Sequence, residues 1–225
     1  MYVPVFPCVA LILISIPLTQ SCCAPSVFQG TAMTYGLISE GKTAFQNMQK
    51  FYYDEEEKKV ARVTTNMMGQ PVRDIFDFPA KKRYVITNGT ACNVTDLNEP
   101  FQKSCVSPSA VFMGSTVLGN TDDNMKVDNY RFNITQGPVT IETSFMIAPM
   151  KGGDCTVVGM VAYGKDQNGY QFSGTTIYMN FSFEITDKSV FQPPKQCDEP
   201  DNTGTLLFEV LGGFSRHGFF LRFRT

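Results

Sequence analysis

The sequence lacks most of the residues on which catalysis and nucleic-acid binding depend. It has one histidine, His217, and no tryptophan among 225 residues. A single histidine argues against a Ser-His-Asp triad, a Cys-His pair and a multi-histidine metal site. A formal net charge of -2 leaves no basic excess for a nucleic acid. We therefore expect no enzyme, no nucleic-acid partner and no catalytic residue, although a glycosidase-like pair of carboxylates is an arrangement that sequence alone leaves open.

Long hydrophobic segments are also scarce. The apolar run of residues 9–16 is too short to span a bilayer, and small residues, Thr19 and Ser21, precede Cys22 at the offsets of a cleavage site. Residues 1–21 are therefore predicted to be a signal peptide, and the protein is expected to be secreted. A bacterial lipoprotein signal is the alternative, but it would require leucine in place of Thr19.

Cysteine is the residue whose number says most about the compartment. One of the seven cysteines, Cys8, lies in the predicted signal peptide. Six remain, an even number that predicts three disulfides in an oxidising environment, and their spacing leaves the connectivity open. No Cys-x-x-Cys or Cys/His pair suggests zinc. The six are Cys22, Cys23, Cys92, Cys105, Cys155 and Cys197.

Four N-glycosylation sequons agree with secretion. They begin at Asn88, Asn93, Asn133 and Asn180. A glycan acceptor has to be reached by the transferase, so these four side chains are expected on the surface.

Alternation of apolar and polar residues dominates the rest of the chain. Strand patterns separated by turn signals, with no long amphipathic helix, predict an all-β, antiparallel protein with minor helix. Residues 22–30 are expected to form an extended lead-in, and residues 109–118 fit either a short helix or a strand. The predicted strands cover residues 45–53, 58–63, 73–78, 82–87, 129–135, 139–147, 155–163 and 175–185.

The last of these strands shows the clearest alternation. Ile177 and every second residue up to Ile185 are apolar, whereas Tyr178, Asn180 and Ser182 fall on the other side. We therefore expect the odd-numbered side chains to face the interior and Asn180 to carry a glycan outward.

The shared apolar face of these strands allows two interpretations. The residue pattern alone favours an ordinary core, closed by a second sheet or a helix. The alternative is a concave half-barrel with a ligand cavity, because Met and Phe adapt well to an acyl chain. The candidate lining residues are Phe132, Ile134, Phe145, Ile147, Ile177, Met179, Phe181 and Phe183.

An acidic turn, residues 54–57, is the one candidate for a metal ligand set. Clustered carboxylates suit calcium, so calcium is the only cofactor considered. A solvated hairpin tip neutralised by the following lysines is the plainer interpretation, and we favour it. Residues 120–124 lack the spacing and final Glu of an EF-hand loop.

Two motifs at opposite ends of the chain resemble the ependymin and ependymin-related family. The first is CxAPxxFxG from Cys22 to Gly30, and the second is VFxPPxxC from Val190 to Cys197. A Tyr-Tyr-Asp hairpin start at residues 52–54, Cys92 in a sequon-rich turn and Cys155 before a long strand agree with it. The resemblance covers residues 22–200, the expected domain.

The resemblance implies a secreted or lysosomal glycoprotein, often a homodimer. It implies two packed antiparallel sheets similar to bacterial lipoprotein carriers, forming a half-barrel around a hydrophobic pocket. We therefore expect non-catalytic binding of a hydrophobic ligand, such as a lipid, a fatty acyl chain or a ganglioside-like molecule. The alternative function is a calcium-binding glycoprotein of the extracellular matrix that acts in cell–matrix adhesion.

The resemblance also implies disulfide pairs and exposes two departures. It pairs Cys22 with Cys155 and Cys92 with Cys197, which leaves Cys23 for Cys105. This chain has Val72 where vertebrate relatives have a cysteine near that position, and no cysteine follows Cys197. Residues 201–225 form an apolar extension that could cover a pocket mouth, touch a membrane or reflect an altered gene end.

Overall fold

The structure is a computed structural model that describes residues 22–38, 43–65, 69–89, 91–120, 122–136, 139–165, 169 and 171–198. The predicted signal peptide and the apolar C-terminal extension lie outside the described residues.

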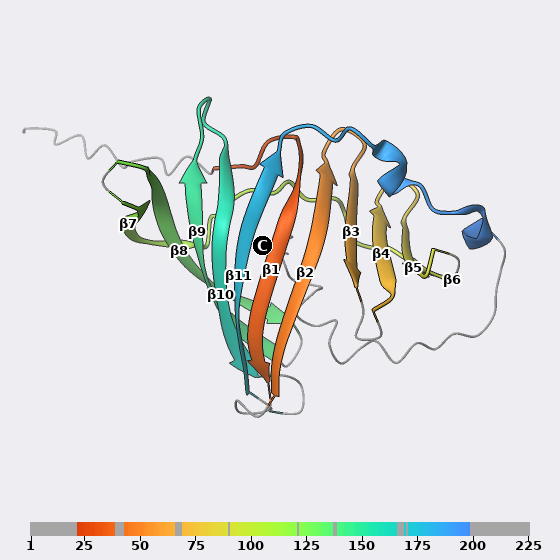
Figure 1. Ribbon diagram of the computed structural model, residues 1–225, viewed down its shortest axis with the longest axis horizontal. Coiled ribbons are helices and arrows are strands. Elements are labelled where there is room, and N and C mark those ends of the chain that lie inside the picture. Colours follow the sequence, from red (N-terminus) through yellow and green to blue (C-terminus); the bar gives the residue numbers. More distant parts are fainter. Residues whose placement is uncertain are drawn as a thin grey trace, which may run out of the picture.

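The described residues form one antiparallel sheet of eleven strands, in the order β6-β5-β4-β3-β2-β1-β11-β10-β9-β8-β7 (Figure 1). The prediction of an all-β protein is confirmed, but the prediction of two packed sheets is wrong. Because β1 pairs with both β2 and β11, it joins two series of hairpins into one continuous sheet. The strands are β1 (Val27–Ile38), β2 (Thr43–Asp54), β3 (Lys59–Thr65), β4 (Pro71–Asp77), β5 (Lys82–Thr87), β6 (Ala91–Asp96), β7 (Val111–Gly119), β8 (Asn124–Gln136), β9 (Val139–Pro149), β10 (Cys155–Lys165) and β11 (Gln171–Ser182).

Each strand predicted from alternation is present, and residues 109–118 resolve to strand β7. Strand β1 is the main omission, because residues 22–30 were expected to be only a lead-in. Its central part carries small residues toward one face, including Gly30 and Gly36. A Cβ at Gly30 would lie 2.6 Å from Cζ of Phe51, and at Gly36 it would overlap the ring of Phe45. The glycines thus let aromatic rings of β2 lie over β1. Because glycine is not apolar in the sense that strand alternation requires, β1 lacks the pattern from which a strand is predicted.

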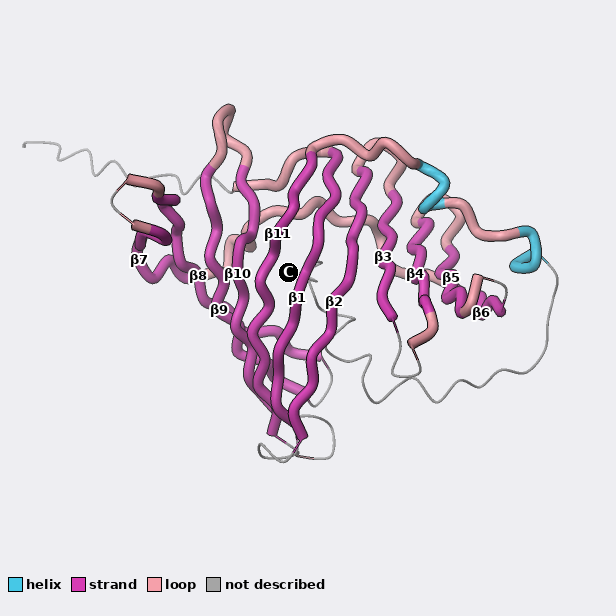
Figure 2. The backbone as a smooth tube through the Cα atoms, in the orientation of Figure 1, coloured by secondary structure: helices cyan, strands magenta, loops and turns pink. Residues whose placement is uncertain are grey.

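The sheet is curved, so its two faces differ (Figures 1 and 2). Strand β8 passes behind the lower ends of β10 and β11, and the loop of residues 97–110 also lies behind the central strands. We call this concave side the inner face; it carries Phe28, Phe51 and Tyr178. The opposite side, which carries Val161 and Ile177, is the outer face.

Among the described residues, a cover lies over one half of the outer face. Residues 183–198, with the 3₁₀ helices η1 (Lys188–Phe191) and η2 (Lys195–Asp198), bury Val190 and Phe191 against Ala61, Ile75 and Ile86 of β3–β5. The Cys92–Cys197 disulfide fixes the end of this segment to β6. The proline-cysteine motif is therefore a cover for the outer face.

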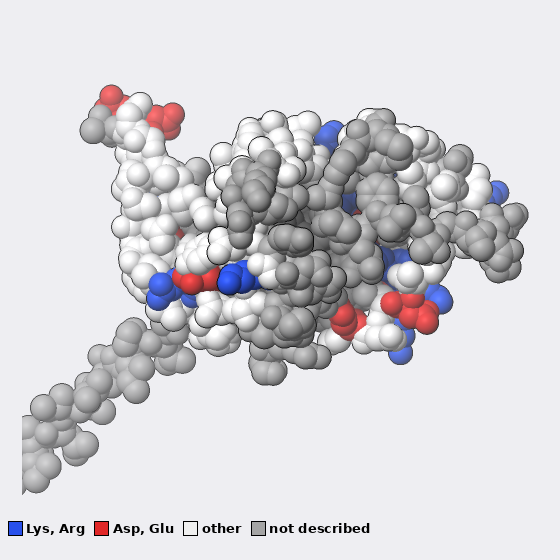
Figure 3. Space-filling model, turned by 90° about the horizontal axis from the view of Figure 1, so that it is seen from below, with Lys and Arg blue, Asp and Glu red and all other residues white. Residues whose placement is uncertain are grey.

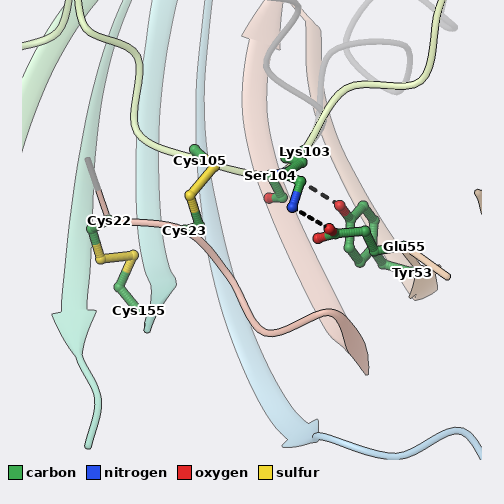
Figure 4. The surroundings of a disulfide bond; sticks show 8 residues. All are labelled: Cys22, Cys23, Tyr53, Glu55, Lys103, Ser104, Cys105 and Cys155. Carbon is green, nitrogen blue, oxygen red and sulfur yellow. Dashed lines mark hydrogen bonds and ion pairs between the residues drawn. A yellow bond between two sulfur atoms is a disulfide. The ribbon is translucent and has the colours of Figure 1, made fainter. Parts of the chain in front are cut away.

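The inner face is covered at one end by the loop of residues 97–110, which we call the covering loop. Cys23–Cys105 ties it to the lead-in, and Cys22–Cys155 ties the lead-in to β10. Figure 4 shows two further attachments: Lys103 pairs with Glu55 at 2.5 Å, and the Ser104 amide donates to the Tyr53 hydroxyl at 3.3 Å. The two disulfides expected from the family resemblance and the Cys23–Cys105 pair left over are all present.

Candidate functional site

A bulge in β11 changes which side chains reach the inner face. Thr31 pairs with Met179 and Gln29 with Ser182, so the register shifts around Asn180, which has a left-handed φ of 55°. Before the bulge the even-numbered residues face inward, and after it Phe181 does. Tyr178 is consequently buried, whereas Ile177 is 46% exposed. The expected inward orientation of Ile177 is wrong.

The predicted lining residues divide between the faces. Phe132, Phe145 and Ile147 are buried together on the inner face, and Phe181 packs there beside Phe51 and Tyr178. Met179 and Ile177 belong to the outer face by register, and Phe183 is 47% exposed beyond the strand end, so these three are not brought together with the others. The side chain of Ile134 lies outside the described residues.

Aromatic residues form two groups along the inner face. One group, on β8–β10, includes Phe132 and Phe145, whose ring centroids are 4.9 Å apart. The other, on β1–β3 and β11, includes Phe28, Phe51 and Tyr53 and is capped by Phe101 of the covering loop, 5.7 Å from Tyr53. Val157 and Met160 of β10 pack against both groups, so the apolar lining is continuous.

A row of buried polar residues crosses the inner face between these aromatic groups. Gln49 of β2 lies opposite Ala32 of β1, and Tyr178 of β11 flanks Ala32 on the other side. Thr34 and Thr176 continue the row through a hydrogen bond of 2.9 Å. Gln49 is only 6% exposed, and its Oε1 has no hydrogen-bond partner within the described structure.

Thr143 of β9 is a second buried residue with an unsatisfied polar atom, at the far side of the row. It is 1% exposed, and its Oγ1 has no hydrogen-bond partner among the described residues. An unsatisfied buried polar atom costs about 1–3 kcal/mol, so each such atom in a native structure calls for a partner. The polar row thus has hydrogen-bonding capacity that the described protein atoms do not fill.

Charge enters the inner face beside Gln49. Arg62 of β3 lies next to Phe51 in register and is buried, with its guanidinium 5.3 Å from the Phe76 ring centroid. Arg83 of β5 lies 5.1 Å from the same ring and forms two hydrogen bonds of 2.8 Å to Asp74. The inner face of β3–β5 therefore carries two guanidinium groups for one carboxylate.

Burial shifts the titration of these groups. Desolvation lowers the pKa of Arg62, and the Asp74 carboxylate opposes that shift. Desolvation raises the pKa of the Tyr178 phenol, and the positive charge of Arg62 acts in the opposite direction. Tyr178 and Arg62 are thus close enough to influence one another, and Tyr178 is a neutral hydroxyl at physiological pH.

The acidic turn makes internal ion pairs. Lys188 Nζ lies 3.1 Å from Asp54 and 2.7 Å from Glu57, which joins the outer-face cover to the turn, and Glu55 pairs with Lys103 of the covering loop. Three of the four carboxylates of the turn, all except that of Glu56, thus take part in these ion pairs. The described residues contain no group of three or more His, Cys, Asp or Glu side chains placed to hold a metal ion.

The four sequon asparagines, Asn88, Asn93, Asn133 and Asn180, are all exposed, as glycosylation requires. Asn133 lines a shallow depression of about 350 Å³ on the outer face, together with Glu142 and Tyr163. This depression is open and partly polar, so it is unsuited to enclosing an apolar ligand.

The outer face of the central strands exposes apolar side chains. The exposed set is Tyr35, Leu37, Met48, Val161, Tyr163 and Ile177, which lie on β1, β2, β10 and β11. Seen from below, the molecule shows charged atoms in small groups of both signs (Figure 3), which is unlike the basic stripe of a polyanion-binding protein. None of the helices within the described residues has the length and hydrophobicity that a bilayer-spanning segment needs.

A curved antiparallel sheet, an apolar inner face crossed by a row of polar residues, and three disulfides define a disulfide-linked, all-β protein. A family comparison identifies the protein more narrowly. The ependymin family model matches residues 46–197, and the chain belongs to the ependymin family. No curated protein matches the chain in a sequence comparison.

Solved structures with a loosely similar fold include an uncharacterised conserved protein from Thermus thermophilus. It has 9% identity and a TM-score of 0.46, covering 77% of this chain and 88% of that one. A LolA superfamily protein from Nitrosomonas europaea gives 6% identity and a TM-score of 0.36, covering 74% and 90% of the two chains. A putative outer membrane lipoprotein-sorting protein domain from Vibrio parahaemolyticus gives 4% and 0.32, covering 73% and 89%.

Proposed function

We propose that this protein is a secreted, non-catalytic glycoprotein that binds a hydrophobic ligand on the inner face of its sheet. One observation carries the proposal. The concave face gathers aromatic side chains from β1–β3 and β8–β11, while the described residues supply no second sheet to pack against them. A concave face with an apolar, aromatic lining of this kind suits a lipid or fatty acyl chain as the ligand.

The covering loop supports the same proposal. Two disulfides, an ion pair and a stack of aromatic rings hold it over one end of the inner face. A loop fixed this firmly gives a binding site a rigid wall, which lowers the ordering cost of binding. The expected ligand therefore lies along the strands with one end against this wall.

The energetics predict which ligands bind best. Each buried methylene contributes about 0.8 kcal/mol, so affinity should rise steeply with acyl chain length until the face is filled. Aromatic and methionine side chains impose few directional demands, so several lipid classes with long chains are expected to bind.

Family membership and three disulfides indicate a protein of the secretory pathway. Secretion, as opposed to residence in the lysosomal lumen, and use of the four sequons belong to the proposal. The homodimer expected from the family resemblance also stays a prediction, which light scattering of the purified protein tests. The alternative function, calcium-dependent adhesion, also stays a prediction; in the acidic turn, Asp54, Glu55 and Glu57 pair with Lys188 and Lys103.

The test is a titration of delipidated, full-length protein with a fluorescent fatty acid, followed by displacement with saturated fatty acids of increasing length. We expect saturable binding and tighter displacement by longer chains. Thr176→Leu enlarges a buried inner-face side chain, whereas Thr175→Leu makes the same change on the exposed outer face. Binding should weaken about fivefold or more in the first variant and stay unchanged in the second. Absence of saturable binding, or equal effects of both substitutions, contradicts the proposal.

A further inference from the structure

The outer face of the central strands carries exposed apolar side chains close to a glycosylation sequon. Strands β8, β9, β10, β11, β1 and β2 lie side by side in this part of the sheet (Figure 1). Val161 and Tyr163 of β10 are 41% and 47% exposed, and Tyr35 and Leu37 of β1 are each 44% exposed. A continuous apolar surface on a water-soluble protein marks a place where something else binds or covers it.

Strand register places the sequon in line with this apolar surface. Asn133 of β8 pairs with Glu142 of β9, and Glu142 pairs with Tyr163 of β10. The same row continues through Ser173 of β11 to Leu37 of β1. Neighbouring strands lie about 4.8 Å apart, so about 10 Å separates Asn133 from Tyr163. A glycan attached to Asn133 therefore begins at the margin of the apolar surface.

The depression beside Asn133 has the chemistry of a sugar-binding site. Its lining combines the ring of Tyr163 with a carboxylate, an ammonium group and a hydroxyl, from Glu142, Lys165 and Thr140. A pyranose ring presents C–H groups on its faces and hydroxyl groups around its rim, so it pairs well with an aromatic ring that has polar groups beside it. The mixture that makes this depression unsuited to an acyl chain thus suits a sugar.

Contacts within the row hold the carboxylate and the aromatic ring in place. The Tyr163 hydroxyl donates a hydrogen bond to the Glu142 carboxylate, which raises the pKa of the phenol. Nη1 of Arg131 lies 3.6 Å from Oε1 of Glu142. A carboxylate accepts up to about four hydrogen bonds, so Glu142 keeps capacity for sugar hydroxyl groups. Tyr163 is anchored through its hydroxyl while almost half of its surface stays exposed.

We propose that this part of the outer face is a docking site for the protein's own N-glycan, attached at Asn133. The first sugar lies over Glu142 and donates hydrogen bonds to its carboxylate, and the second sugar stacks on the ring of Tyr163. The following sugars extend toward Leu37 and cover the exposed side chains of β10 and β1. The glycan thus covers the central strands, as residues 183–198 cover β3–β5.

Covalent attachment makes weak sugar contacts sufficient. A group held by a short flexible tether has an effective concentration of the order of millimolar, so it binds its site without high intrinsic affinity. This inference rests on the glycoprotein part of the proposed function, because it requires a glycan at Asn133. It is independent of the ligand on the inner face.

The first experiment measures how fast an endoglycosidase that cuts between the two innermost sugars releases each glycan from native, full-length protein. The protein is secreted by cells that make only high-mannose glycans, and glycopeptide mass spectrometry monitors each site. A docked glycan hides the bond that the enzyme cuts. We expect release at Asn133 to be several-fold slower than at Asn93, which is exposed on the edge strand β6, and the two rates to become equal after unfolding.

The matched variants are Tyr163→Ser and Tyr163→Phe. Both remove the hydroxyl that contacts Glu142, but the second keeps the aromatic ring. Because Tyr163 is exposed, both variants are expected to fold. Tyr163→Ser should raise the release rate at Asn133 to that at Asn93, whereas Tyr163→Phe should keep the slow rate.

The second experiment measures the accessibility of the outer face by hydroxyl-radical oxidation. Trimming the glycans of folded wild-type protein should raise the oxidation of Tyr163 and Val161 several-fold. Phe112 is the reference, since it is 53% exposed and packs against Tyr130 on the inner face, so its oxidation should stay constant. Asn133→Gln should have the same effect as trimming, and Asn93→Gln should have none.

The outcomes separate this inference from the proposed ligand site. An Asn133 without a glycan, equal release rates at Asn133 and Asn93, or an unchanged rate in Tyr163→Ser overturns the docking site. Protection of Tyr163 that survives trimming and grows with protein concentration assigns the face to a second copy of the chain, and it also overturns the docking site. Absence of fatty-acid binding in the same samples overturns only the ligand site on the inner face.

Discussion

The two faces of the central strands differ in an unexpected way: polar side chains are buried on the inner face, and apolar side chains are exposed on the outer face. On β2, polar Gln49 is buried on the inner face while its neighbour Met48 is 58% exposed on the outer face. On β11, Thr176 is buried and Ile177 is exposed. Shape therefore decides burial here, because the concave side encloses whatever side chains point into it.

This difference between the two faces indicates where side chains lack hydrogen-bond partners or apolar contacts. A buried polar atom without a hydrogen bond costs free energy, and so does an apolar side chain left in water. Over β3–β6 the segment of residues 183–198 covers the outer face, and the usual pattern of buried Ile75, Ile86 and Phe191 returns. On β1, β2, β10 and β11, in contrast, the outer face keeps exposed apolar side chains.

The largest expected effect compares two side chains of β2. Phe51→Ala removes a ring that is 1% exposed and contacts Phe28, Tyr178 and Phe181, so unfolding free energy should fall by about 3–5 kcal/mol. Met48→Ala, on the outer face, should change it by less than about 0.5 kcal/mol. Denaturant unfolding of both variants measures the contrast, and similar losses would show that the faces are equally covered.

The second prediction compares the disulfides that hold the two covers. Removing Cys23–Cys105 or Cys92–Cys197 by paired serine substitutions should cost about 2–5 kcal/mol each, since both close long loops. The two variants should differ in ligand affinity. Loss of Cys23–Cys105 releases the covering loop and weakens binding, whereas loss of Cys92–Cys197 leaves binding intact. Equal losses of affinity in the two refolded variants would contradict this assignment.

The third prediction concerns alkaline pH. Burial raises the pKa of Tyr53 from 10.0 to about 12, so the unfolded chain loses this proton first as the pH rises. Stability from this group is complete below pH 10 and is lost progressively between pH 10 and 12, by about 2–3 kcal/mol. Tyr53→Phe should lack this component. The check is the pH dependence of unfolding, together with tyrosinate absorbance, and a parallel decline in both proteins would count against it.

The smallest expected effect on stability concerns the bulge at Asn180, where β11 changes from even-numbered to odd-numbered residues on its inner face. Asn180 has a φ of 55°, which a β-branched residue tolerates poorly, so Asn180→Val should cost about 1–2 kcal/mol. Asn180→Gly should be close to neutral. Because both changes also remove a sequon, Ser182→Ala is the control that removes the sequon and leaves the bulge. Thermal unfolding measures all three, and a loss in Ser182→Ala equal to that in Asn180→Val would assign the effect to the glycan.

Alternation predicted the hairpins well because it depends only on local period. The pairs β2–β3 and β4–β5 fall where apolar residues recur every second position between turn signals. The same rule failed in β11, since one extra residue at Asn180 inverts the alternation. The sequence holds a weak signal for it, because asparagine is among the few residues that adopt the left-handed conformation.

Strand β1 and the single-sheet topology could not be predicted from local sequence patterns. Gly30 and Gly36 are small because Phe51 and Phe45 of the neighbouring strand fold over them, so the cause lies in β2. Whether apolar faces close onto a second sheet or remain one curved layer depends on how β1 joins β2 to β11 across distant parts of the chain. No window of sequence contains that information.

The polar row had a signal that could have been found. The odd-numbered residues of β2 share one face, on which two consecutive polar residues interrupt an aromatic series: Phe45, Asn47, Gln49, Phe51 and Tyr53. Arg62 meets that face only through the register of β3, which the hairpin turn sets. Sequence therefore indicates an unusual face on one strand, and the structure adds the guanidinium.

Native mass spectrometry of freshly secreted, full-length protein tests the central claim most directly. We predict a species heavier than the glycosylated chain by the mass of one amphiphile, which organic extraction removes and which oleate restores. A chain that carries no such mass and takes up no oleate after extraction would contradict a ligand site on the inner face.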